Sequence, residues 1–215
     1  FDAQKDFAPV STLCHFDLAV LAPENSRYKS MAALLSDARS QPGKLNLGTI
    51  QAGSTQNLAA ELLKASAGVD IQVVPFNGSP ALLQALRGNQ VDASVEILGP
   101  MMGQIAAGAV RALAVMGGQR SAALPQVPTL AESGVPGFDV RSWNALAAPA
   151  RTPPEVVALL NQKVQEVLGQ PALRQRLLAL NVEPRGSTPA QLAALLASET
   201  RRWSDVITRA GIPRQ

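Results

Sequence analysis

The residues of this 215-residue chain that are best suited to chemistry lie in a polar turn, "GTIQAGST", over residues 48–55. Gly53 allows the backbone to turn tightly, and Ser54 and Thr55 supply hydroxyls where a helical pattern begins. The free amides and the dipole of a helix start favour a carboxylate or a phosphate. Two interpretations remain open: an anion cradle, or an ordinary turn in which Ser54 only caps the helix. The turn matches neither a Walker loop nor a dinucleotide-binding motif.

Two more polar turns follow apolar stretches. "PFNGSP" contains Asn77-Gly78, a pair that signals a turn by itself, so it need not bind anything. Glu96 ends the apolar stretch "VDASVEI" and is either a solvated strand end or a ligand contact. Asp92 is expected at the opposite end of that strand, which argues against a hydrolase with paired carboxylates.

The chain has one cysteine and one histidine, Cys14 and His15. Neighbours on a strand point to opposite faces, so these two make a poor nucleophile and base. A single cysteine forms no intrachain disulfide, and zinc sites need three or four ligands. Ser142 lacks the setting of a nucleophile elbow. The sequence therefore favours a protein that is not an enzyme, with neither a metal site nor a cofactor.

Composition narrows the class further. Hydrophobic residues make up 47% and charged residues 16%, which is typical of a folded globular chain. The apolar runs are shorter than the roughly 18 to 20 residues that span a bilayer. The net charge of +3 is scattered and only eight aromatics occur, which argues against nucleic-acid binding. The chain opens at Phe1 without a signal peptide, which is typical of a mature or trimmed chain.

Hydrophobic periodicity predicts strands that alternate with helices through the first half of the chain. The expected strands are 8–23, 44–49, 69–76, 91–97 and 110–116; the expected helices are 30–43, 55–68, 79–90 and 98–109. Ser30 and Ser79 are expected to cap two of these helices, with Pro80 at the first helical position and Gly68 closing a third. The alternation predicts parallel strands with right-handed crossovers. Ligands bind such sheets at the carboxyl ends of the strands, where the three polar turns fall.

The second half of the chain changes character. Residues 117–142 are rich in glycine and proline and are expected to be irregular, with a short helix at 129–133. A strand over 140–150 follows. Two helices then start at the capping boxes "TPPE" (152–155) and "TPAQ" (188–191), each with proline just inside. Their one-sided apolar residues indicate packing helices.

Several stretches together resemble one known family, the Bug-type receptors. These are the extracytoplasmic solute-binding components of tripartite tricarboxylate transporters. The resemblance covers essentially the whole chain. It is carried by "PGKLNLGT", "GSTQNLAAELL", "VPFNGSPALLQALRGNQVDA", "RALAV", "LPQVPTLAESGVPGF", "SW" and "GSTPAQLAALLASETRRW".

The resemblance implies an α/β fold like that of type II periplasmic binding proteins, with two lobes that close on a small carboxylate by a hinge. Residues 19–139 are expected to form one complete lobe. Residues 1–18 and 140–215 are expected to form the hinge strands and part of the other lobe. The implied function is a periplasmic receptor that delivers a small organic acid or amino acid to membrane transporter subunits.

The resemblance also implies where the ligand binds. Such receptors usually hold a carboxylate with backbone amides and bridging waters. The matching positions of this chain are Thr49, Gly53, Ser54, Thr55 and Asn57 in the first turn, Phe76, Asn77 and Gly78 in the second, and Glu96 at the third.

Three departures from the family bear on the ligand. Relatives often carry His at position 57, Tyr-Lys at 76–77 and Asp near Glu96. Losing a lysine while keeping an acid makes the cleft less suited to a plain dicarboxylate. We therefore expect a ligand with an amino or hydroxyl group that Glu96 and Asn77 can bind.

The chain also lacks an N-terminal βαβ segment that relatives have, so it is expected to be truncated relative to the family. The C-terminal helices, predicted over 153–179 and 189–210, would then expose apolar faces, and self-association is expected to follow. One alternative stays open. The effector-sensing domain of a transcription regulator has a similar architecture, and a helix-turn-helix in the upstream sequence would select it.

Overall fold

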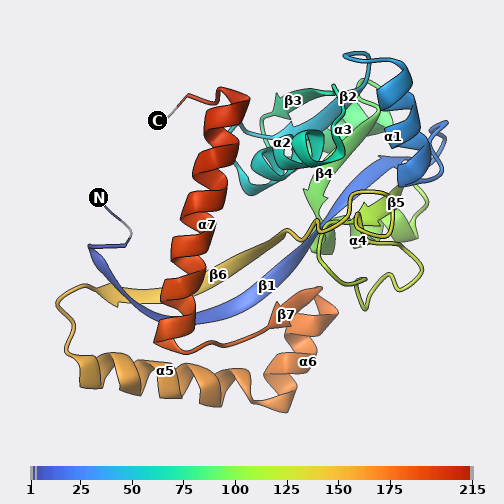
Figure 1. Ribbon diagram of the computed structural model, residues 1–215. Coiled ribbons are helices and arrows are strands. Elements are labelled where there is room, and N and C mark those ends of the chain that lie inside the picture. The colour runs from blue at the N-terminus through green and yellow to red at the C-terminus, as the bar shows by residue number, and fades with distance from the viewer. Residues whose placement is uncertain (1, 3, 214–215) are drawn as a thin grey trace. The chain divides into compact units, whose positions relative to one another are not determined.

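The computed structural model describes residues 2 and 4–213 (Figure 1). The chain divides into two compact units. Unit 1 comprises Phe1–Phe16 and Ser142–Asp205, and unit 2 comprises Asp17–Arg141 and Val206–Gln215. The long strand β1 (Phe7–Pro23) passes from the first unit into the second. Unit 2 carries all three polar turns.

The sheet of unit 2 has the strand order β3-β2-β4-β1-β5. In it, β2 (Asn46–Ile50) pairs in parallel with both β3 (Gln72–Phe76) and β4 (Ala93–Ile97), as predicted. By contrast, β1 runs antiparallel to β4 and to β5 (Val110–Val115), so the expectation of parallel strands was wrong for the first strand. Periodicity shows that a helix separates two strands, and it carries no information on the direction in which a strand enters the sheet.

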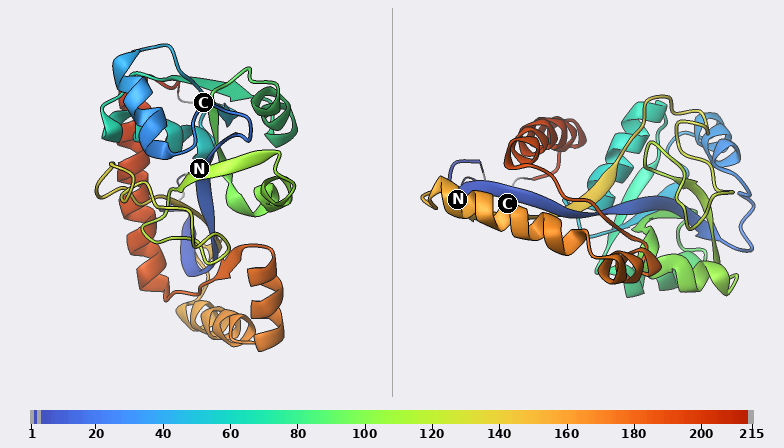
Figure 2. Two further views of the ribbon diagram at one scale, coloured as in Figure 1. Left: turned by 90° about the vertical axis from the view of Figure 1, so that its right-hand side faces the viewer. Right: turned by 90° about the horizontal axis from the view of Figure 1, so that it is seen from below.

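Four helices belong to the same unit: α1 (Met31–Ser40), α2 (Thr55–Ala67), α3 (Ser79–Arg87) and α4 (Leu98–Ala106). Figures 1 and 2 show α2, α3 and α4, teal to light green, packed around the strands, with α2 and α3 each against β2, β3 and β4.

Local signals explain where most of these helices begin and end. Ser30 caps α1 by accepting a hydrogen bond from the amide of Ala33 at 3.2 Å. Gly68 ends α2 in the left-handed region, at φ 61°, which a residue with a side chain adopts only at a cost. Both caps were predicted.

The helix α3 begins differently from the expectation. Its N-cap is Gly78, at φ 89°, so Ser79 is the first helical residue and Pro80 the second. No side chain caps this helix. The serine was expected to cap because serine commonly does. The glycine takes that place because its backbone reaches a positive φ without a clash.

Gly48 shows how closely α3 lies against β2. A Cβ added there would sit 2.5 Å from Leu82 Cδ1 and 3.2 Å from Val91 Cγ2. Leu82 and Val91 are both buried. Any side chain at this position would force the buried side chain of Leu82, or α3 itself, to move away from the strand that leads into the first polar turn.

One further prediction, a short helix in the irregular stretch of unit 2, was wrong. Residues 130–134 form a hydrogen-bonded turn and Thr129 bridges to Val115, so the helix expected over 129–133 is absent. Thr129 and Glu132 do exchange the two bonds of a capping box: the Thr129 amide donates to Glu132 Oε2 at 2.8 Å, and the Glu132 amide donates to Thr129 Oγ1 at 3.1 Å. The helix goes no further because Gly134, at φ 102°, follows within one turn.

Unit 1 contains β6 (Arg141–Pro149, from Ser142 on), α5 (Pro154–Leu168), α6 (Pro171–Ala179), β7 (Val182–Pro184) and most of α7 (Pro189–Ala210). The box "TPAQ" is confirmed, since Thr188 and Gln191 exchange both bonds. The box "TPPE" was wrong, because the N-cap of α5 is Pro153 and no side chain caps the helix.

The helix expected over 153–179 is broken in two. The amide of Gly169 still bonds to Gln165 O, and Pro171 then starts α6. Proline has no amide to continue the helix and restricts the residue before it to extended conformations. The strand β7, which pairs with β1 at Cys14–Phe16, was not predicted.

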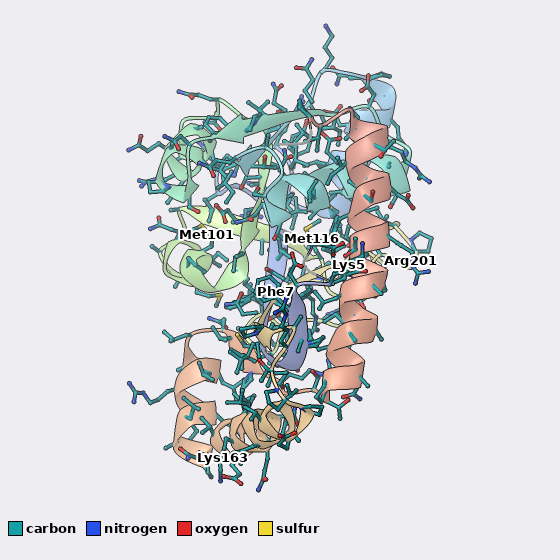
Figure 3. The ribbon with its side chains drawn as sticks, turned by 90° about the vertical axis from the view of Figure 1, so that its left-hand side faces the viewer. Lys5, Phe7, Met101, Met116, Lys163 and Arg201 are labelled. Carbon is teal, nitrogen blue, oxygen red and sulfur yellow. The ribbon has the colours of Figure 1, made fainter. Side chains whose placement is uncertain are left out.

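Apolar side chains are exposed on unit 1. The exposed large hydrophobic residues among those described are Phe7, Leu146, Val156, Leu159, Leu160, Val167, Leu178 and Leu180, all in this unit. Half of them lie on α5, which Lys163 marks in Figure 3, and Leu159 is 53% exposed. The expectation of an exposed apolar face on the C-terminal helices is confirmed for α5. Within the described part of the chain, no helix has the length and apolar character needed to cross a membrane.

Candidate ligand-binding site

The three polar turns lie at one edge of the sheet of unit 2. They follow β2, β3 and β4, and these strands are paired in parallel, so their carboxyl ends point the same way. The structure therefore brings together segments that are separated by 20 to 40 residues in the sequence. This is the edge where sheets of this kind bind ligands.

The first turn is held by the side chain of Asn57. Its Nδ2 donates to Thr49 Oγ1 at 3.2 Å, and its Oδ1 accepts from the amide of Gly53 at 3.0 Å. Its own amide donates to Ser54 Oγ at 3.2 Å, which makes Ser54 the N-cap of α2. Asn57 and Thr49 are buried. One asparagine thus connects the end of β2, the turn and the start of α2.

These bonds decide which groups of the turn remain for a ligand. Gly53 and Ser54 donate their amides inside the turn, to Asn57 Oδ1 and to Gln51 O. The first intrahelical bond runs from Leu58 to the carbonyl of Ser54. The amides of Thr55 and Gln56 precede that bond, so helix geometry leaves them without an intrahelical acceptor. They are two donors of this turn that could hold an anion.

A surface hollow of about 490 Å³ lies between the first and second turns. It is lined by Gln51, Ala52, Pro75, Phe76 and Asn77, which belong to the first and second turns. A hollow of this volume can hold a ligand the size of a small organic acid. Its lining residues carry no charge.

The second turn is the more open of the two. Asn77 is exposed, Phe76 and Gly78 are half-buried, and Gly78 donates its amide to Phe76 O at 2.9 Å. Pro80 supplies no amide, and Ser79 is the first residue of α3.

Two environments were expected for Glu96, a solvated strand end or a ligand contact, and its burial contradicts the first. Glu96 is only 3% exposed, so the idea of a solvated strand end was wrong. Its Oε2 accepts from Gln56 Nε2 at 3.1 Å and from the amide of Ile97 at 3.0 Å. Its Oε1 is buried without a hydrogen-bond partner among the described residues.

Sequence reasoning missed four contributors: Gln56, which holds Glu96, and Gln51, Ala52 and Pro75, which line the hollow. The signal for Gln56 was present, since a polar residue in the first turn of a helix at the carboxyl edge of a sheet can face a neighbouring strand end. Among the described residues, no group of three or more His, Cys, Asp or Glu side chains could hold a metal ion.

Comparison with known proteins places the chain among receptors. The family model of TctC, described as "Tripartite tricarboxylate transporter family receptor", matches residues 1–212. A UPF0065 protein encoded in the tcbD-tcbE intergenic region of Pseudomonas sp. strain P51 is 35% identical over 208 residues, which are 96% of this chain and 62% of that protein.

Two solved structures are similar along nearly all of the chain. R. palustris Rpa4515 with adipate is 34% identical, with a TM-score of 0.85, over 98% of this chain and 71% of that one. MatC from Rhodopseudomonas palustris with bound malate is 33% identical, with a TM-score of 0.79, over 96% and 71%. These likenesses confirm the predicted α/β fold of the periplasmic binding-protein type. The chain spans about 62% of the length of the first curated relative.

Proposed function

The chain belongs to the tripartite tricarboxylate transporter receptor family, as its motifs predicted, and we propose that it is a solute-binding receptor for a small carboxylate. In this proposal it works in the periplasm and passes its ligand to the membrane subunits of such a transporter. Two similar proteins were solved with dicarboxylates, adipate and malate.

One observation carries the proposal. The amides of Thr55 and Gln56 stand at the start of α2 without an intrahelical acceptor, and residues of the same turn, Gln51 and Ala52, line a hollow of suitable size. Amides at a helix start and the positive end of the helix dipole stabilise a carboxylate. In this arrangement Asn57 shapes the turn, Ser54 caps the helix, and Thr55 adds a half-buried hydroxyl.

The proposal includes no catalytic role for this site. The one cysteine and the one histidine, Cys14 and His15, both lie in unit 1. Nucleophilic or acid–base catalysis needs an activated side chain within hydrogen-bond reach of the substrate. The hydroxyls and amides of the first turn are suited to binding, and we assign the protein no reaction.

Replacing Thr55 by proline tests the amide directly. Thr55 is the first residue of α2, where proline is tolerated, and Ser54 already has the extended conformation that proline requires, at φ −67° and ψ 161°. The Thr55→Pro variant therefore loses one amide donor while the helix is kept. Thr55→Ala is its control, since it loses the hydroxyl and keeps the amide.

We expect calorimetry to detect binding of at least one acid from a panel of small mono- and dicarboxylates. Thr55→Pro should weaken that binding by about 1.5–3 kcal/mol, or roughly 10- to 100-fold, which is typical for a bond to a charged group. Thr55→Ala should weaken it less. The proposal fails if no carboxylate binds, or if the two variants bind equally well.

A second part of the proposal concerns partners of unit 1. The exposed apolar side chains of α5, including Val156, Leu159 and Val167, form a face that water solvates poorly. We assign it to contact with a second copy of the chain. Light scattering should show a mass that rises with concentration, and a Leu159→Gln variant should remain monomeric. A wild-type monomer at high concentration would contradict this assignment.

A further inference from the structure

The carboxylate of Glu96 is buried against the first turn of α2. One of its oxygens, Oε2, accepts two hydrogen bonds, from Gln56 Nε2 and from the amide of Ile97. The other oxygen, Oε1, is buried and has no partner among the described residues. A buried carboxylate oxygen without a donor is unfavourable, and such atoms in native proteins usually have a partner that is still to be identified.

A second unpaired polar atom lies on the same strand. Ser94 is 1% exposed, and its Oγ is also buried without a partner. Residues two apart on a strand point to the same face, so Ser94 and Glu96 present their side chains on one side of β4. Ser94 Oγ and Glu96 Oε1 can thus each accept a hydrogen bond close to the carboxyl end of β4.

Gln56 connects this acid to the helix start. Its backbone amide lies at the helix start and has no intrahelical acceptor, and its side-chain amide donates to Glu96 Oε2. One residue, Gln56, thus offers its backbone amide to a carboxylate and its side chain to Glu96, which links the two groups. Rotation of one interfacial side chain is a common accompaniment of binding.

The groups around the first turn favour an acid that also carries a hydrogen-bond donor. The residues that line the hollow are uncharged, and the acid packed beneath the first turn is Glu96. Because Glu96 Oε1 is buried without a donor, a ligand group that donates a hydrogen bond to it is favoured over a second acceptor.

We propose that Glu96 determines ligand specificity: its free Oε1 accepts a hydrogen bond from an α-hydroxyl or α-ammonium group of the bound acid. This inference rests on the proposed function, since it needs a carboxylate on the start of α2. The Gln56 side chain turns aside as the donor enters. The preferred ligands are then α-hydroxy or α-amino acids.

Two matched sets of acids test this by calorimetry. Propionate, lactate and alanine differ only at the α-carbon, as do succinate, malate and aspartate. In at least one set, we expect the hydroxy or amino acid to bind at least ten-fold more tightly than the unsubstituted parent. Equal binding of parent and substituted acids would overturn the inference while leaving the proposed function intact. Binding of none of the six would count against the proposed function itself.

Two variants test whether Glu96 causes the preference for hydroxy or amino acids. Glu96→Gln keeps the shape and can still accept from Gln56, but its amide nitrogen cannot accept from the ligand, so the ten-fold preference should fall below about three-fold. Glu61→Gln removes an acid from the same helix, α2, and should keep the preference. Thermal melting shows whether both variants fold.

If Glu96→Gln does not fold, a crystal structure of the wild-type protein with its tightest acid decides the question. A ligand hydroxyl or ammonium group within hydrogen-bond distance of Glu96 Oε1 supports the inference. A ligand that leaves Oε1 bonded only to water overturns it, as does a Glu96→Gln variant that folds and keeps the full preference.

Discussion

The turn between β2 and α2 and the turn between β3 and α3 lie at the same sheet edge, and each starts a helix. In the first, Asn57 and Ser54 make side-chain bonds that fix the backbone of residues 50–54. In the second, Gly78 begins the helix without any side-chain cap, and Asn77 is exposed. Both line one hollow.

The difference shows how one edge can combine a fixed and an adaptable part. The first turn holds its amides in place, which lowers the entropy cost of binding an invariant group such as a carboxylate. The second turn has few internal bonds, so its side chains can adjust to the rest of a ligand. The following variants test this contrast, from the largest expected effect to the smallest.

Gly48→Ala should affect both turns through the core. The added Cβ meets Leu82 Cδ1 of α3 at 2.5 Å, so this buried leucine or the helix that carries it has to move. We expect a loss of about 1–3 kcal/mol of unfolding free energy, typical of overpacking, measured by urea denaturation.

Gly103→Ala is the control for that variant, because a Cβ there meets nothing within 4 Å and the residue is helical. It should leave stability unchanged or raise it by up to about 1 kcal/mol. Equal losses in the two variants would show that the contact at Gly48 is not tight.

Asn57→Ala and Asn77→Ala compare the two turns directly. The first leaves Thr49 Oγ1 and the amide of Gly53 without their partner, at a cost of about 1–3 kcal/mol. The second removes an exposed side chain and should change stability by less than about 0.5 kcal/mol. Chemical denaturation measures both, and similar losses would remove the contrast between the turns.

Ser54→Ala and Ser79→Ala compare the two helix starts. Ser54 accepts a bond from the amide of Asn57, so its loss should cost about 1 kcal/mol. Ser79 is inside α3 and caps nothing, so its replacement should be close to neutral. Thermal melting of the pair is sufficient, and a large effect at Ser79 would place the cap at the serine after all.

Glu61→Gln should have the smallest effect, and it depends on pH. Burial raises the pKa of the Glu61 carboxyl above its ordinary value of 4.5, an effect that Lys64 partly offsets. The folded state therefore disfavours the charged form, and the variant should be slightly more stable than wild type at pH 7. The difference should fade as the pH falls through the raised pKa toward 4.5. A difference that persists at pH 3 would point to a cause other than charge.

The order of elements in unit 2 was predictable because its signals are local. A hydroxyl at Ser30 or Ser54 caps a helix within three residues, and a glycine at position 68 ends one. Prediction failed where a neighbouring residue had a stronger effect on where a helix begins or ends. Gly78 displaced Ser79 at one helix start, and Pro171 divided a helix that periodicity alone would have continued.

The sequence by itself determined the polar turns, their place after apolar strands, and the family to which they belong. Only the tertiary structure decided that Asn57 folds back onto Thr49 and Gly53, and that Gln56 holds a buried Glu96. The physical reason is the distance along the sequence over which each interaction acts. A cap acts within one turn of helix, whereas the burial and partners of Glu96 depend on a strand and a helix some 40 residues apart, which strand pairing brings together.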